Sequence, residues 1–217
     1  VIIAIQGDWM LSAQPLRLWA RTLAMDWNAD LGAARTLSWR SAQQLAQRLA
    51  RTEGLSNICN EIVHSVADAV AARLAALAIL DEADRDLTIV ATHGYSHELV
   101  KQLRIKPGAG IIGAVFESDR ALYRLPSMDA SGVQHDYRSR PRYRTDSFIA
   151  MPVRLAGRPL GVVCVADRLD DQPFTRRDGA AIRALLAPAA LALGRERALV
   201  RMRGFARGAT VDPLSGT

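Results

Sequence analysis

The chain has 217 residues, of which 49% are hydrophobic and 23% are charged, with a formal net charge of +6 at pH 7. This fits an ordinary soluble protein with one domain of about 150 residues and flanking segments. The longest uncharged apolar run, Ala184 to Gly194, contains a proline and is shorter than the roughly 20 residues of a membrane helix. We therefore expect no membrane span. The opening VIIAI is no signal peptide, and it fits either a strand or the stub of an upstream membrane helix.

The positive charge comes almost entirely from arginine, since Lys101 and Lys106 are the only lysines. The arginines are spread along the sequence, with no recognisable reading helix, so nucleic-acid binding is not expected. Cys59 and Cys164 lie in apolar periodic segments and lack the spacing of a metal or redox pair. We expect both to be buried free thiols of a cytoplasmic protein.

Residues 1–54 are predicted to be an N-terminal helical and linker segment. Within it, RSAQQLAQRLARTEG places Leu45 and Leu49 on one face of a helix, and Gly54 interrupts the pattern. From Leu55, the run LSNICNEIVHSVADAVAARL repeats apolar residues every three or four positions. This spacing predicts an amphipathic helix that opens a domain.

Strand patterns follow that helix. The apolar runs AALAIL and LTIVAT are separated by the polar spacer DEADRD, which predicts an antiparallel pair over residues 76–92. A second hairpin is predicted in SFIAMPVRLAGRPLGVVCVADR, with its turn at Gly157. Both faces of GVVCVA are apolar, so this strand is covered on both sides. We expect helices on one face of the sheet, and segment 94–146 over a pocket on the other.

The last predicted element is a long helix. Thr175 and Asp178 have the spacing of a capping box at its start, and Pro188 is expected to kink the helix or to remove one backbone hydrogen bond. A seam with coiled-coil spacing then runs along Ile182, Leu186, Ala189, Leu193 and Val200, with Glu196 at the skipped position. Because the arginine-rich end is too polar for a core, we expect the seam to pair with its copy in a homodimer. The alternative is that it packs on its own sheet.

Three segments, in their order and spacing, resemble the GAF domain: RIKPGAGIIGAVFESDRALYR, YRTDSFIAMPVRLAGRPLGVVCVADR and FTRRDGAAIRALLAPAALALGRERA. The resemblance covers about residues 55–197. It implies an α+β fold with an antiparallel sheet of about six strands. It also implies helices from both chain ends on one face and a loop-covered small-molecule pocket on the other. Residues 198–211 are then the end of a signalling helix.

Residues 212–217 resemble the entry to a GGDEF domain, which commonly begins Asp-x-Leu-Thr-Gly-Leu. Asp212, Leu214 and Gly216 match this pattern, and Ser215 and Thr217 depart from it. The resemblance implies a GGDEF domain truncated after its first residues. It also implies that the full-length protein is a diguanylate cyclase, which makes cyclic di-GMP from two GTP, and that this fragment is its non-catalytic sensor.

The richest run for ligand binding is VQHDYRSRPRYRTDS, because arginine forks beside aromatic rings suit carboxylates, phosphates and planar rings. The candidate pocket residues are Tyr123, Arg124, His135, Tyr137, Arg140, Arg142, Tyr143 and Asp146. The alternative is a solvated loop whose arginines pair with Asp136 and Asp146. The pattern identifies neither the ligand nor a cofactor.

Cyclic-nucleotide-binding members of the family carry Asn-Lys, then Phe and Asp-Glu downstream. This chain has Asp167, Arg168, Phe174, Asp178 and Gly179 at the corresponding positions, and three of the five depart. Cyclic AMP or GMP is therefore not expected, and the stretch from Phe174 to Asp178 is interpreted as a helix start.

The pigments of this family find little support in the sequence. A bilin needs a cysteine at the pocket mouth, where neither cysteine is expected. His93, His97 and His135 are candidate haem ligands, although solvated loop histidines are the simpler interpretation. No nucleophile elbow or P-loop is present, so no enzyme is expected in this fragment.

Two functions remain open. The first is a ligand-gated regulatory module of a cyclase, which requires an open pocket. The second is a ligand-free structural dimerisation module, which couples an upstream domain to the output domain and fills its pocket with side chains such as Phe116, Tyr123 and Phe148. We expect the open pocket.

Overall fold

The computed structural model describes residues 32–81, 83–95, 103–124, 144–145 and 147–209. The predicted entry to a GGDEF domain, at residues 212–217, lies outside this range.

A six-stranded antiparallel sheet forms the centre of the fold, with the strand order β3-β2-β1-β6-β5-β4. The strands are β1 (Ala72–Leu80), β2 (Leu87–His93), β3 (Arg104–Ile105), β4 (Leu122–Arg124), β5 (Phe148–Leu155) and β6 (Arg158–Arg168). Both predicted hairpins are present, as β1 pairs with β2 and β5 pairs with β6. β1 and β6 lie side by side in the middle, with Leu77 opposite Val163. The predicted α+β fold is confirmed.

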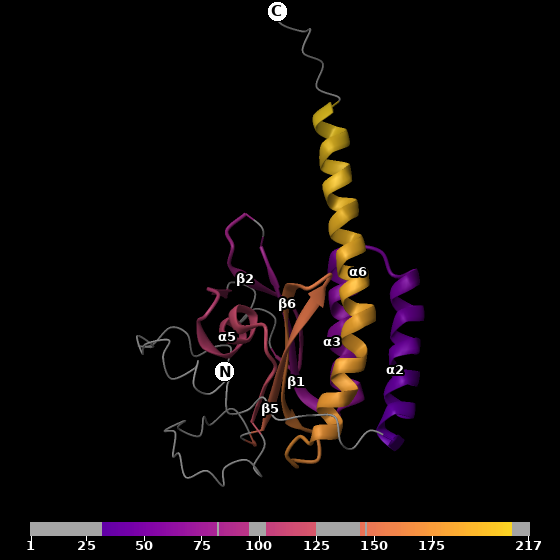
Figure 1. The fold of residues 1–217 in the computed structure, drawn as a ribbon, viewed down its shortest axis with the longest axis vertical. Coiled ribbons are helices and arrows are strands. Elements are labelled where there is room, and N and C mark those ends of the chain that lie inside the picture. The colour runs from indigo at the N-terminus through magenta and orange to yellow at the C-terminus, as the bar shows by residue number, and fades with distance from the viewer. Residues whose placement is uncertain (1–31, 82, 96–102, 125–143, 146, 210–217) are drawn as a thin grey trace, which may run out of the picture.

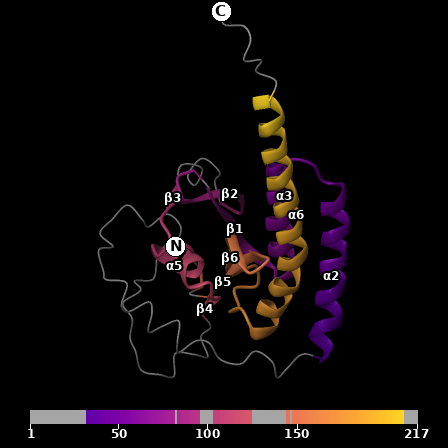
Figure 2. The ribbon, with the colours of Figure 1, turned by 45° about the horizontal axis from the view of Figure 1, so that its top comes forward.

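Among the described residues, four helices cover this sheet unequally. Helices α2 (Gly32–Arg51), α3 (Leu55–Ala69) and α6 (Arg176–Ala209) lie on one face, and the short α5 (Gly110–Ser118) lies on the other (Figure 1). Both views show α6 continuing well past the sheet (Figures 1 and 2). The predicted helices at both ends of the domain are confirmed.

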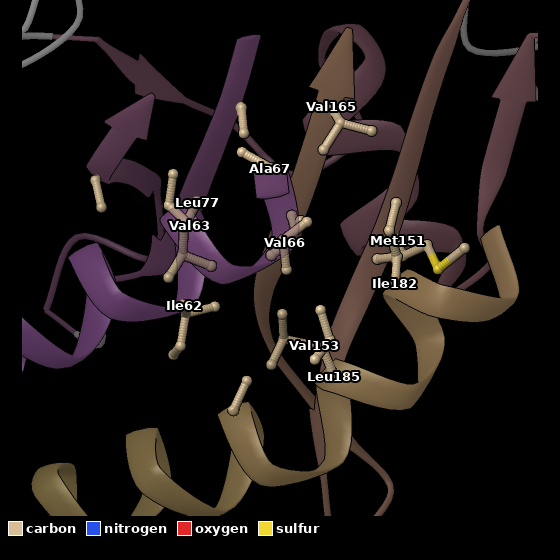
Figure 3. Close-up of a cluster of buried hydrophobic side chains, with 14 of the residues drawn as sticks. Ile62, Val63, Val66, Ala67, Leu77, Met151, Val153, Val165, Ile182 and Leu185 are labelled. Atoms are coloured by element: carbon tan, nitrogen blue, oxygen red, sulfur yellow. The ribbon is translucent and has the colours of Figure 1, made fainter. Parts of the chain in front are cut away.

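The side chains of β6 alternate between two hydrophobic cores. Val163 and Val165 belong to the core under the helical layer, whereas Val162, Cys164 and Ala166 belong to the core under α5. Figure 3 shows the first of these cores, where sheet residues meet α3 and α6. The prediction that this strand is covered on both sides is confirmed.

The start of α6 has the predicted cap. The carboxylate of Asp178 accepts hydrogen bonds from the backbone N–H (2.7 Å) and hydroxyl (2.8 Å) of Thr175, and its own N–H donates to that hydroxyl (3.4 Å). This reciprocal pattern satisfies N–H groups that the first helical turn leaves without partners. Pro188 lies inside α6, and the helix continues through it.

The predicted seam of α6 faces this chain's own core along most of its length. Ile182, Ala189 and Leu193 are 0–1% exposed in the core under the helical layer, and Leu186 is partly buried against the same core. Val200, beyond them, is 54% exposed. From residue 182 to residue 193, the structure therefore supports the alternative interpretation, in which the seam packs within its own domain.

The arginines are more concentrated than the sequence alone indicated. Helices α2 and α6 together contain twelve arginines and only two acidic residues, Asp178 and Glu196. These adjacent helices account for more than the whole net charge of +6. Helices α2 and α6 are thus strongly basic, and the rest of the chain is net acidic.

Candidate ligand-binding site

The sheet surface under α5 is built from small side chains. Strands β1, β5 and β6 present the small residues Ala76, Ala78, Ala150, Cys164 and Ala166 on this face, with the larger Val162 and Phe148 beside them. On the helical face Ala72 and Ala75 are small, and the other buried residues of these strands are larger: Leu77, Ile79, Ile149, Met151, Val153, Val163 and Val165. A floor of small residues leaves room above it, so this is the face on which a pocket is expected.

Groups from several elements pack around this floor. Ile112 and Val115 of α5 are buried against it, and Tyr95, Leu103 and Phe116 pack on the same core. The predicted pocket depends on segment 94–146, and much of that segment lies outside the described residues. An open pocket therefore stays a prediction.

Most candidate ligand residues also fall outside the described part of the chain. These are His135, Tyr137, Arg140, Arg142, Tyr143 and Asp146, and the same is true of His97. Arg124 is the last residue of β4, where its backbone pairs with Phe148. Phe148 faces the α5 core, as expected for a residue near the pocket.

Tyr123 lies on the face opposite the predicted pocket. Its ring is 4% exposed in the core under the helical layer, and its hydroxyl accepts a hydrogen bond from Arg183 Nη2 of α6 (3.2 Å). Burial raises the pKa of Tyr123, and Arg183 opposes this rise. Tyr123 was predicted from the sequence to be part of the pocket wall. The structure instead makes it a contact between β4 and α6.

A buried carboxylate that the sequence analysis did not single out for this role lies at the end of β6. Asp167 is 1% exposed and accepts hydrogen bonds from the N–H groups of Arg144 (3.0 Å) and Thr145 (2.8 Å). The hydroxyl of Thr145 donates a third hydrogen bond (2.9 Å). A buried carboxylate is stable only when donors surround it, so Asp167 fixes the chain just before β5.

The other positions that correspond to the cyclic-nucleotide motif have structural contacts. The Arg168 guanidinium donates two hydrogen bonds to Asp170 (3.1 and 2.9 Å) and one to Asp178 (3.1 Å). The Arg168 side chain also lowers the pKa of Asp170. Phe174 is 2% exposed, and its N–H donates to Ser147 Oγ (2.7 Å). The interpretation of this stretch as a helix start is confirmed.

The two cysteines are free and buried, as predicted. Cys59 of α3 lies in the core under the helical layer, and Cys164 of β6 lies in the core under α5. Burial raises the pKa of each thiol to about 12. Because the sheet separates them, they cannot form a disulfide with each other in this fold.

His93 is the one candidate haem ligand among the described residues. Its ring makes an edge contact with the ring of His64 of α3, with ring centroids 5.3 Å apart. It therefore lies on the helical side of the sheet. Within the described ranges, no group of three or more His, Cys, Asp or Glu side chains is arranged to hold a metal ion. No helix among the same residues is both long and apolar enough to cross a membrane.

A helical layer on one face of an antiparallel sheet, with one short helix on the other, defines an α+β domain. The chain belongs to the GAF domain family, whose model matches residues 54–193. This match agrees closely with the limits 55–197 implied by the sequence.

Solved structures with the same fold come from proteins of different function. The GAF domain of a phosphoenolpyruvate-protein phosphotransferase from Acinetobacter is 19% identical, with a TM-score of 0.61, over 77% of this chain and 97% of that one. Its counterpart from Coxiella burnetii is 22% identical, with a TM-score of 0.59, over 80% and 99%. Free methionine-R-sulfoxide reductase from Neisseria meningitidis is 16% identical, with a TM-score of 0.58, over 81% and 98%. At these identities the likeness concerns the fold alone.

Proposed function

We propose that this chain is the sensor and dimerisation module of a cytoplasmic diguanylate cyclase, in which α6 controls a C-terminal GGDEF domain. The observation that supports this most is the continuity of α6. It begins at a capping box against the sheet and runs to Ala209, close to the residues that resemble a GGDEF entry. Cyclic di-GMP synthesis needs two GGDEF active sites that face each other, so a helix that sets their pairing also sets the rate.

A small-molecule ligand is the proposed input. A ligand shifts the pairing only if it binds one arrangement of the module better than the other, and a preference of about 1–3 kcal/mol is enough. The floor of small residues under α5 is the proposed binding face, with the arginine-rich run before β5 as its polar part. We propose no identity for the ligand and no sign for its effect.

The proposed homodimer contact lies on the outward face of α6. Leu191 (64% exposed) and Met202 (58% exposed) are large apolar residues of this face, and Ala187 and Ala198 are exposed beside them. Their positions follow the spacing of a helix seam, rotated from the one predicted at Ile182. A second copy can pack here without disturbing the core.

A ligand-free structural module is the second candidate function. The observation that favours it is the burial of the floor, since Ala76 and Ala150 are 0% exposed and Cys164 is 4% exposed. A face that is almost entirely excluded from solvent is typical of a filled core. In that case the domain couples an upstream segment to the output domain by dimerisation alone.

Thiol catalysis is not part of the proposal, although a reductase is among the structures of similar fold. A nucleophilic thiol must be accessible and largely ionised near neutral pH. Cys59 and Cys164 are 0% and 4% exposed, and burial raises the pKa of each to about 12. We propose that the fragment itself is not catalytic.

The test uses the full-length protein incubated with GTP, together with native mass spectrometry of the purified chain. The expected results are formation of cyclic di-GMP and a copurified small molecule. Cyclic di-GMP without any bound molecule favours the structural module. Absence of cyclic di-GMP under all conditions contradicts the cyclase assignment.

A further inference from the structure

Two separate routes of contact join the chain before β5 to the start of α6. In the first, the carboxylate of Asp167 holds the backbone of Arg144 and Thr145. The next residue, Arg168, donates to Asp178 in the first turn of α6 (3.1 Å). The two contacts of Asp167 connect residues 22 and 23 positions apart in the sequence.

The second route runs through Ser147, which is 1% exposed. Its Oγ accepts the N–H of Phe174 (2.7 Å), and its carbonyl accepts the N–H of Asp167 (3.4 Å). Phe174 directly precedes Thr175, whose hydroxyl donates to Asp178. Both routes therefore meet at Asp178, the residue that caps α6.

The backbone of Asp167 is itself unusual. Its φ of 53° is in the left-handed region, which Asp and Asn tolerate better than other residues with a Cβ. This conformation occurs within β6, where the next residue, Arg168, still pairs with Ala72 of β1. It is sustained only while the surrounding contacts hold it.

We propose that Asp167 is a positioning residue that couples the chain at Arg144 and Thr145 to the first turn of α6. Movement at Arg144 and Thr145 must either break the hydrogen bonds to a buried carboxylate or move the end of β6 with it. Because Arg168 and Phe174 link that end to the capping box, the start of α6 responds. The proposal rests on the proposed function in one respect, since it describes how a signal on the α5 side reaches α6.

The test is amide hydrogen exchange in the whole chain with Asp167→Asn. Asparagine keeps the size and the left-handed backbone, and it replaces one acceptor oxygen by an NH₂ group that cannot accept the bound N–H. We expect exchange at Arg144 and Thr145 to accelerate at least about tenfold, the factor that corresponds to 1.4 kcal/mol. Exchange at Asp178 and Gly179 in α6 should accelerate as well.

Asp84→Asn is the matched control, because Asp84 forms an exposed ion pair with Arg104 beside the β1–β2 turn. This turn follows Leu80, at the other end of β1 from Ala72, which pairs with Arg168. It should leave exchange at Asp178 and Gly179 unchanged. If Asp167→Asn accelerates exchange at Arg144 and Thr145 alone, Asp167 is a local anchor and the coupling is refuted.

A milder variant keeps the test decisive if Asp167→Asn does not fold. Thr145→Val removes one hydroxyl donor to Asp167 and leaves both backbone donors in place. Smaller increases at Thr145, Asp178 and Gly179, without change in the central strand β1, support the coupling. An equal increase in β1 indicates global destabilisation and overturns it. None of these results depends on cyclase activity, so the coupling and the cyclase assignment can fail independently.

Discussion

Replacing Leu193 by alanine separates the two possible roles of the α6 seam. Leu193 is 1% exposed in the core under the helical layer, where it packs with residues of the chain's own sheet and helices. Truncating a fully buried leucine to alanine costs about 2–5 kcal/mol, because apolar contacts are lost and a cavity remains. A domain of this kind has a total stability of about 5–15 kcal/mol, so the loss is a large fraction of it.

Leu191→Ala is the matched variant, two positions away on the same helix. Leu191 is 64% exposed, so its truncation should change the stability of one protomer by less than about 0.5 kcal/mol. It should, however, weaken self-association if the outward face of α6 is the dimer contact. The two variants should therefore change different quantities. Leu193→Ala should lower the stability of the protomer, and Leu191→Ala should weaken self-association.

The assay is urea unfolding followed by far-UV circular dichroism, repeated over a range of protein concentrations, with sedimentation equilibrium for the dimer. The concentration series is needed because dimerisation raises apparent stability by mass action. The reasoning is refuted if Leu193→Ala unfolds at the wild-type midpoint but dissociates the dimer. That result would indicate that the dimer interface is the α6 seam predicted from the sequence.

Three further variants or probes test individual contacts. Cys59 and Cys164 should not react with a thiol reagent at pH 8 until the chain unfolds, because burial raises the pKa of each thiol to about 12. Rapid labelling of the native chain would contradict their burial. Thr175→Ala should lower the free energy of unfolding by about 0.5–2 kcal/mol through loss of the cap, measured by urea unfolding, and an unchanged midpoint would argue against the capping box. Gly113→Ala should lower the free energy of unfolding by about 1–3 kcal/mol in the same assay, because the added Cβ would lie 2.3 Å from the carbonyl oxygen of Lys106. An unchanged free energy would show that the backbone around Lys106 can shift to make room.

The features that were predictable from the sequence are local ones. The hairpins depend on apolar runs around short polar spacers, and the cap of α6 depends on Thr175 and Asp178, three residues apart. In each case the interacting groups are close in the chain. A local sequence pattern therefore predicts such a contact directly.

The features that the sequence did not predict are of two kinds. Some depend on contacts between distant parts of the chain, and others depend on which face of a strand a side chain occupies. Asp167 holds backbone N–H groups 22 and 23 residues away, and backbone donors leave no signature in the sequence. Tyr123 lies in a three-residue strand, where alternation is too short to fix which face a side chain occupies.

The seam of α6 was ambiguous for a different reason. Apolar residues at intervals of three and four are needed both by a helix packed on its own sheet and by a helix paired with another. The burial of Ile182 and Leu193 distinguishes the two, and spacing alone cannot.

The concentration of arginine in the helical layer has a consequence for assembly in solution. Two copies that meet along α6 bring together two pairs of helices, and the α2 and α6 of each copy contain twelve arginines and two acidic residues. Dissolved anions weaken the repulsion between like charges, over a distance of about 10 Å at 0.1 M ionic strength. Added salt should therefore tighten the proposed dimer, whereas it weakens interfaces made of opposite charges.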